Sequence, residues 1–296
     1  MRPNILMVIT HDTGRHLGYY GRGVETPNLD RLAGEGIAFS NLFCSAPQCS
    51  PSRASFLTAR YPHSNGLIGL AHRGFRLNAD EPLLPALLAQ HGYVTHLFGV
   101  QHESLDPKTL GYQNVVPVKS RSCLDVTPPV LEFLAKKPKE PFFAMVGFTE
   151  THRPFPQYDG PVDAVQPLPY LPDVPGVRRD VAALNIVVRR ADEKIGEILD
   201  TIEETGLNGN TLVTFTTDHG IAFPGAKATL LDPGIEIALL MRGPYGVEGG
   251  KRVDALLSNI DFMPTILDFC DLPVPRNVQG ESMLPLIRGQ TEALHD

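Results

Sequence analysis

The chain has 296 residues, a net charge of −7, 42% hydrophobic residues and 20% charged residues. This composition is typical of a globular protein with a large core, and the acidic balance argues against a nucleic-acid partner. No apolar run of the sequence approaches the length of a membrane span, which argues against a transmembrane protein. An anionic substrate would therefore have to be met by local positive charge rather than by the overall field.

The predicted elements alternate between strands and helices. Continuous apolar or β-branched runs, typical of strands buried on both faces, lie at residues 4–9, 94–98, 142–148, 211–217 and 237–241. Helical spacing and end signals predict helices over residues 26–36 with Thr26 as the cap, 82–90, 179–206, and 258–272 with Ser258 or Asn259 as the cap. Alternating elements of this kind predict an α/β fold with a mostly parallel central sheet and helices on both faces.

We expect one domain over residues 1–296, with the proline-rich segment 153–177 shaping the rim of a pocket. The N-terminal apolar run ends in His11 and Asp12 rather than in a small-residue cleavage site, so we interpret it as a first strand and not as a signal peptide. The cysteines show no framework spacing, which favours reduced thiols. These features together predict a cytoplasmic protein.

Histidine and aspartate follow the ends of four predicted strands. The pair His11 and Asp12 follows the first strand, His102 and His152 follow the next two, and Asp218 and His219 follow the fourth. In open α/β sheets, ligands bind outside the carboxyl ends of the strands. Because four strands direct such side chains to one edge, the sequence predicts a functional site there, most simply a metal site.

The stretch "QCSPSRASFLTAR", residues 48–60, predicts a helix that begins with Ser50 as the cap and Pro51 at the first helical position. Cys49 then lies just before a helix N-terminus, where backbone N–H groups favour an anion. Four interpretations of this cysteine are open: core packing, metal ligation, a nucleophile, or a group made from cysteine.

These segments resemble the sulfatase family of the alkaline phosphatase superfamily. The stretch "CSPSRASFLTAR" is similar to the sulfatase signature, Cys-x-Pro-Ser-Arg followed by Leu-Thr-Gly/Ala-Arg. The segments "RPNILMVITHDTGRHLGYYG", "TPNLDRLAGEGIAFSN", "TDHG" and "LLDPGIEIALLMRGP" resemble sulfatase segments in the expected order. The segments "FTETHRPF" and "DHGIAFPGAK" are most similar to the heparan N-sulfatase (sulfamidase) branch.

The resemblance implies a hydrolase whose nucleophile is formylglycine (3-oxoalanine), made from the signature cysteine by a maturation enzyme. Cys49 occupies that position, and Arg53 matches the arginine that steadies the aldehyde hydrate. His102 matches the family's base, and His152 matches a histidine that contacts sulfate and protonates the leaving group. Lys227 matches a cation that holds the sulfate.

The resemblance also implies one divalent metal ion, Ca²⁺ in the family, with Asp12, Asp218, His219 and the modified Cys49 among its ligands. His11 stands where relatives usually carry an aspartate. An imidazole can still ligate, but it removes a negative charge and adds a nitrogen ligand, which favours Mn²⁺ or Zn²⁺.

Two further departures from the family pattern affect the expectations. Val100 occupies the position of a family lysine, so one cationic contact to sulfate is missing, and Gln101 or Arg153 are candidates to replace it. At its C-terminal end the chain is expected to stop before the smaller subdomain that relatives usually carry.

The resemblance therefore predicts hydrolysis of a sulfate ester or sulfamate in a small sulfated substrate, such as a sulfated sugar. One alternative is a phosphonate monoester or phosphodiester hydrolase of the same superfamily, which the absent lysine keeps open. Another is a non-catalytic homologue, although a chain without activity has no use for the maturation motif.

Overall fold

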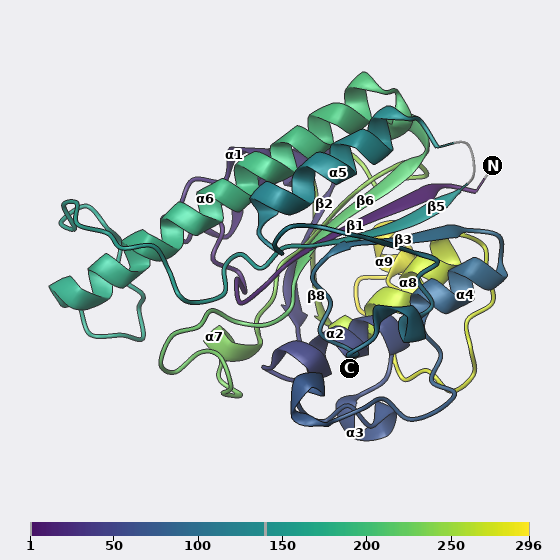
Figure 1. Cartoon of the computed structure of the whole chain (residues 1–296), viewed down its shortest axis with the longest axis horizontal. Coiled ribbons are helices and arrows are strands. Elements are labelled where there is room, and N and C mark those ends of the chain that lie inside the picture. The colour runs from purple at the N-terminus through teal and green to yellow at the C-terminus, as the bar shows by residue number, and fades with distance from the viewer. Residues whose placement is uncertain (1, 139–140, 296) are drawn as a thin grey trace.

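A computed structural model describes residues 2–138 and 141–295 of the chain (Figure 1). Within these ranges eight strands form one sheet in the order β4-β3-β5-β1-β6-β7-β2-β8. The strands are β1 (Asn4–Thr10), β2 (Ile37–Phe43), β3 (Val94–Gly99), β4 (Asn114–Val116), β5 (Phe142–Gly147), β6 (Thr211–Thr217), β7 (Leu239–Arg242) and β8 (Lys251–Ser258). Strand β7 runs antiparallel to both of its neighbours, and the other pairs are parallel. The predicted mostly parallel α/β sheet is confirmed.

Helices cover both faces of the sheet, as predicted (Figure 1). The α-helices are α1 (Pro27–Glu35), α2 (Cys49–Thr58), α3 (Pro62–Asn65), α4 (Leu84–Gln90), α5 (Cys123–Ala135), α6 (Pro175–Glu204), α7 (Asp232–Ile235), α8 (Phe262–Phe269) and α9 (Leu284–Ile287). Short 3₁₀ helices lie at Gly18–Tyr20, Ala71–Arg73, Pro107–Leu110, Leu207–Asn210 and Asn259–Asp261. None of the helices within the described residues is long and apolar enough to cross a membrane.

The position of strand β1 in the middle of the sheet explains why its sequence is continuously apolar. Ile5 and Met7 pack into the layer that contains α4, α8 and α9, whereas Leu6 and Val8 pack into the layer that contains α1, α5 and α6. All four side chains are at most 1% exposed. A strand between two helical layers buries both of its faces, so the alternation of polar and apolar residues disappears.

The five predicted strands all form, whereas β2, β4 and β8 were not predicted. Ser40 and Asn41 interrupt the apolar run of β2 where its register to β8 shifts. Strands β4 and β8 are the two edges of the sheet and are largely exposed, so they lack a long apolar run.

The observed helices differ from the predicted ones at positions where proline or a side-chain hydrogen bond is involved. Helix α6 begins at Pro175 rather than at residue 179, because proline is well suited to the first helical turn. Helix α5 was not predicted, since Pro128 and Pro129 lie inside its sequence. Thr26 precedes α1 but does not cap it, because its hydroxyl accepts the Gly18 N–H and donates to Asp30.

Ser258 does take the capping role that was predicted for it or for Asn259. Its side chain and that of Asp261 form a reciprocal capping box at the 3₁₀ turn that leads into α8. In the proline-rich segment, Pro154 to Pro156 line two cavities of about 530 and 470 Å³, so the segment forms pocket walls as expected.

Candidate active site

The register of β1 and β6 brings two predicted ligand pairs together. The strands are parallel neighbours, and Thr10, the last residue of β1, lies opposite Thr217, the last residue of β6. His11 and Asp12 follow the first strand directly, and Asp218 and His219 follow the second. The four side chains therefore leave the same edge of the sheet, which is the carboxyl edge where ligands bind in α/β folds.

Helix α2 delivers Cys49 to this edge. The helix begins at Cys49 itself after Gln48, and not at Pro51 as predicted, while the hydroxyl of Ser50 accepts the N–H of Ala71 instead of capping. The helix is fastened to the site by Ser52, whose hydroxyl donates to the carbonyl oxygen of Asp218. Cys49 is thus the first residue of a helix whose N-terminus faces the site.

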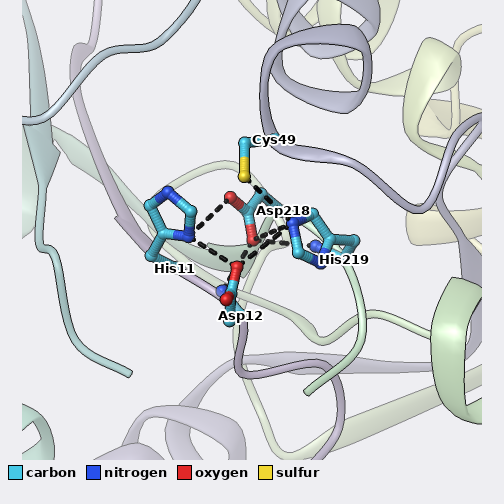
Figure 2. A group of neighbouring side chains, drawn as sticks. All are labelled: His11, Asp12, Cys49, Asp218 and His219. Atoms are coloured by element: carbon cyan, nitrogen blue, oxygen red, sulfur yellow. Dashed lines mark hydrogen bonds and ion pairs between the residues drawn. The ribbon is translucent and has the colours of Figure 1, made fainter. Parts of the chain in front are cut away.

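Five of the predicted residues form one buried cluster (Figure 2). One ligand atom from each of His11, Asp12, Cys49, Asp218 and His219 lies within 4.8 Å of all the others. Figure 2 shows the two carboxylates between the two imidazole rings, with the sulfur of Cys49 directed at the same centre. The structure therefore brings together every residue that was predicted to ligate metal.

The donor atoms of this cluster fit a divalent cation. His219 Nδ1 lies 2.9 Å from the carbonyl oxygen of Gly220, to which it can only donate, so a neutral His219 would direct its Nε2 lone pair at the cluster. That Nε2 lies 3.2 Å from Asp12 Oδ1 and 3.8 Å from Asp218 Oδ1. Lone pairs that converge without a proton between them repel one another, and a cation among them removes that repulsion. Carboxylate oxygen with imidazole nitrogen is a suitable set for Ca²⁺, Mn²⁺ or Zn²⁺.

Asp218 is held as a carboxylate by its surroundings. Its Oδ1 accepts the backbone N–H groups of Asp12 and His219, both at 2.9 Å, and its Oδ2 lies 3.0 Å from Nε of Arg53. Burial raises the pKa of Asp218, but the charges of His219, His11 and Arg53 outweigh it and hold the pKa well below its usual range. Arg53 is fully buried beneath the cluster, and its ion pair with Asp218 fixes its position.

Asp12 links the cluster to Lys227. The Lys227 ammonium donates to both carboxylate oxygens, at 2.9 and 2.7 Å, and the imidazole Nδ1 of His11 lies 2.7 Å from Oδ1. Burial raises the pKa of Asp12, but the hydrogen bond and charge of His11 and the charge of His219 lower it to about 2. Burial lowers the pKa of Lys227, and the charge of Asp12 raises it above its ordinary value. Both groups are charged at neutral pH.

The thiol of Cys49 does not have the properties of an activated cysteine. Its sulfur lies 3.4 Å from Nε2 of His219 and is buried. Burial, followed by the charge of Asp218, raises the pKa of the thiol to about 12, although the charge of Lys227 acts in the opposite direction. Burial and the nearby carboxylates thus favour the protonated thiol, which is a poor nucleophile at neutral pH.

His102 and His152 flank the ring of His11. The centroid of each ring lies 4.8 Å from that of His11, in edge-to-face geometry. His102 Nδ1 lies 3.0 Å from His11 Nε2, and burial with the charge of Arg53 lowers the pKa of His102 to about 3. His152 Nε2 lies 4.0 Å from Asp12 Oδ2, and its side chain is 42% exposed. His152 is therefore the more open of the two.

Gln101 and Arg153, the two candidates to replace the missing lysine at position 100, both make other contacts. Val100 itself is buried. Gln101 hydrogen-bonds within its own turn, to the Ser104 carbonyl and to backbone N–H groups. The guanidinium of Arg153 lies over two phenylalanine rings and donates to Asp180. Neither expectation of a substitute is supported by these contacts.

Sequence reasoning missed Glu103, which lies buried next to the site. Its Oε2 accepts the backbone N–H of His102 at 2.7 Å, and its burial raises the pKa of the carboxyl. Its Oε1 and Nη1 of Arg53 are both buried without a hydrogen-bond partner among the described residues. A signal existed in the sequence, since an acidic residue directly follows the predicted base in "GVQHE".

Comparison with known proteins agrees with this geometry. A protein-family model described as Sulfatase matches residues 3–272. The chain is 32% identical to N-sulphoglucosamine sulphohydrolase of Homo sapiens, over 98% of this chain and 67% of that protein. It is 27% identical to an ulvan-active sulfatase of Formosa agariphila, over 96% of this chain and 54% of that protein. The chain therefore spans between about half and two thirds of the length of these relatives.

Solved structures share the fold over the whole chain. A structure from work on glycosaminoglycan metabolism by Bacteroides thetaiotaomicron superposes with a TM-score of 0.85 at 24% identity, covering 100% of this chain and 79% of that one. Another, in complex with its substrate D-glucosamine-2-N,6-O-disulfate, superposes with a TM-score of 0.82 at 21% identity, covering 100% and 82%. Because the sequence identities are below 25%, these structures show that the fold is shared and nothing more.

Proposed function

The chain belongs to the sulfatase family, and on that premise we propose that it hydrolyses a sulfate ester or a sulfamate. The family match over residues 3–272 agrees with the signature around Cys49. The observation that carries the proposal is the buried cluster, in which Cys49 at the start of α2 meets two carboxylates and two imidazoles. Because burial raises the pKa of the Cys49 thiol, the unmodified side chain would be a weak nucleophile, which supports its conversion to another group.

We infer that Cys49 is converted to formylglycine by a maturation enzyme, and that one divalent cation binds in the cluster. When present, formylglycine would add water to form a hydrate, one hydroxyl of which would be the nucleophile toward the sulfur of the substrate, and the cation would supply positive charge beside it. Asp12, Asp218 and His219 would hold the cation, with His11 and the modified residue 49 completing the set. Arg53, fixed by Asp218, holds positive charge beneath residue 49.

Three side chains are placed to handle the sulfate group and its protons. Lys227 lies at the edge of the cluster on Asp12 and binds the anionic oxygens of the substrate. His102 uses Nδ1 towards His11, so Nε2 is the atom that accepts a proton. His152 Nδ1 contacts the carbonyl of Arg153 at 2.5 Å, which leaves its exposed Nε2 to deliver a proton to the leaving group. Charges fixed in this way before the reaction stabilise the charge that develops in the transition state.

The substrate we propose is a small sulfated molecule, with a sulfated sugar as the first candidate. The similarity to human N-sulphoglucosamine sulphohydrolase and to an ulvan-active sulfatase supports this class. We treat residues 1–296 as a single catalytic α/β domain, since one sheet runs through the described residues and carries the cluster at one edge.

Two measurements test the proposal. Protein made in a host with an active maturation system is digested with trypsin, and the mass of the peptide with residue 49 is measured. We expect the change from CH₂–SH to CHO. Turnover is then measured on paired aryl sulfate and aryl phosphonate esters and on a sulfamate, before and after metal removal with a chelator. A modified peptide with metal-dependent sulfatase turnover supports the proposal, whereas a modified, metal-loaded protein inactive on all sulfates and sulfamates contradicts it.

A phosphonate monoester or phosphodiester hydrolase is the second candidate, and Val100 favours it. The buried valine removes a cationic contact to the substrate anion, so the set of anion contacts differs from that of the usual family site. Turnover of the phosphonate ester exceeding that of the sulfate ester would favour this second function.

A further inference from the structure

Two cavities are lined by the two histidines that pack against His11. One, of about 500 Å³, is lined by His102 and the segment after β3. The other, of about 470 Å³, is lined by His152 and the proline-rich segment. Because the rings of both histidines pack against His11, each cavity adjoins the cluster.

These two cavities carry positive charge in an otherwise acidic protein. The charged and titratable residues of the first are His72, His102 and Arg121, with no carboxylate among its lining residues. The second contains Arg121, His152 and Arg190 with one carboxylate, Glu150, which already accepts hydrogen bonds from the Ser122 hydroxyl and the Cys123 N–H. The contrast is a third cavity of about 620 Å³, whose lining includes four carboxylates and one arginine.

Arg121 lines both cavities, and hydrogen bonds to its carbonyl oxygen anchor its backbone. Its carbonyl oxygen accepts both the N–H and the hydroxyl of Thr149, each at 2.9 Å, just after β5. Ser122 next to it is bonded to Glu150 at 2.6 Å. The guanidinium is exposed and has no ion pair or hydrogen bond within residues 2–138 and 141–295. An arginine whose backbone is anchored and whose guanidinium donors are unpaired is suited to bind a carboxylate or sulfate group.

The position of this arginine separates it from the group that reacts. Asp12 and Asp218 pair with Lys227 and Arg53, and neither has Arg121 within 4.0 Å. Arg121 nevertheless lines one cavity together with His102 and the other together with His152, so it lies near the mouth of the site. A substrate whose sulfate reaches the cluster would therefore extend past Arg121.

We propose that Arg121 binds a second anionic group of the substrate, so that the preferred substrate is a sulfated molecule with a further sulfate or carboxylate. The proposal rests on the function proposed above and specifies its substrate class. The protein as a whole has a net charge of −7, which does not attract an anion. Arg121 then supplies local positive charge at a distance from the scissile group.

Binding to unreactive protein tests this without turnover. The Cys49→Ala protein is titrated calorimetrically with a monosulfated glucosamine, a disulfated glucosamine, and a sulfated disaccharide that contains a uronic acid. We expect at least one of the two dianionic ligands to bind about tenfold more tightly than the monosulfated one, equivalent to about 1.4 kcal/mol. Which of the two is preferred distinguishes a second sulfate from a carboxylate.

Variants of Arg121 decide whether this residue is responsible. Arg121→Gln should abolish the preference for two anions, and Arg121→Lys should restore part of it. Arg288→Gln is the matched control, since Arg288 is exposed after α9 and lines neither cavity. Equal affinity of the Cys49→Ala protein for ligands with one and two anions, or a preference that survives in Arg121→Gln, would overturn the proposal.

Turnover of an aryl sulfate with a single anion separates this proposal from the proposed function. With Cys49 intact, Arg121→Gln should keep kcat/KM on that ester within about twofold. An equal loss on substrates with one and two anions would place Arg121 on the scissile sulfate and overturn the proposal. If the parent protein hydrolyses no sulfate ester or sulfamate at all, the proposed function fails, while the binding result still decides whether Arg121 selects dianions.

Discussion

Helices α2 and α6 are buried in different ways. All ten residues of α2 are buried, among them Arg53 and the hydroxyls of Ser50, Ser52 and Ser55. Helix α6 has 30 residues and buries one stripe, which includes Leu184 and Ile198, and exposes charged residues on the opposite side. The first helix is thus inside the protein with its polar groups, and the second lies on its surface.

The difference shows what each helix is for. Polar groups buried in α2 need partners, and two of them find a partner in the site: Arg53 pairs with Asp218, and Ser52 donates to the Asp218 carbonyl. Helix α6 is stabilised by apolar packing against α1, α5 and the sheet. We therefore expect substitutions in α2 and its partners to remove activity, and substitutions in the buried stripe of α6 to remove stability.

The largest effect should come from Cys49→Ala. Turnover should fall by on the order of a thousandfold or more, because the nucleophile is lost, while the melting temperature stays near that of the parent. Steady-state assays and thermal unfolding check both parts. Cys270→Ala, at the end of α8, is the control and should keep its turnover. If Cys49→Ala turns over substrate as fast as the parent protein, residue 49 is not the nucleophile and the proposed role of α2 is wrong.

Asp218→Asn should lower both activity and stability. It leaves Arg53 fully buried without its carboxylate, and breaking a buried ion pair in this way costs about 3–5 kcal/mol. Urea unfolding of the metal-free proteins measures the loss. Asp180→Asn, in an exposed pair with Arg153, should cost about 0–1 kcal/mol. Equal losses for the two variants would mean that burial of the pair around α2 does not matter.

Ile198→Ala tests the other side of the comparison. Removing this fully buried side chain of α6 should lower the free energy of unfolding by about 2–5 kcal/mol, because it leaves a cavity. The kcat of folded protein should not change, which active-site titration alongside the rate assay would show. Glu193→Ala, exposed on the same helix, should stay within about 0.5 kcal/mol. A specific loss of kcat in Ile198→Ala would show that α6 also shapes the site.

His16 connects the loop after β1 to α6 and should make stability depend on pH. Its Nε2 lies 2.8 Å from the Asn185 side chain, and burial lowers its pKa from 6.5 to about 4. The unfolded chain therefore takes up the proton first, so stability should fall as pH drops from 6.5 towards 4, by at most about 3 kcal/mol. His16→Gln should flatten its share of this dependence in urea unfolding across that range. An unchanged pH profile would contradict the assignment.

The smallest effect concerns the metal preference of the cluster. His11→Asp adds a carboxylate and removes a nitrogen donor, so Ca²⁺ should bind about tenfold more tightly relative to Mn²⁺ or Zn²⁺. Metal titration of the metal-free proteins measures the three affinities. His72→Asp, outside the cluster, is the control for charge alone. The idea is wrong if His11→Asp keeps the same order and ratio of affinities as the parent.

The local chemistry of the chain could be predicted from its sequence. Apolar runs before His11, His102, His152 and Asp218 indicated buried parallel strands, because a strand between two helical layers must be apolar on both faces. The signature around Cys49 indicated the family. The exposed edge strands and the proline-containing helix α5 carried no such pattern, and they were missed for that reason.

Only the tertiary structure decided how these residues affect one another. The position of Cys49 at a helix start predicts a lowered thiol pKa, yet burial and the charge of Asp218 raise it to about 12. Arg153 looked free to replace a lysine, yet it donates to Asp180 of α6, which the fold brings near it, whereas Gln101 is occupied within its own turn. Burial and charge depend on neighbours that are distant in sequence, so the sequence determined which groups are present and the fold determined their state.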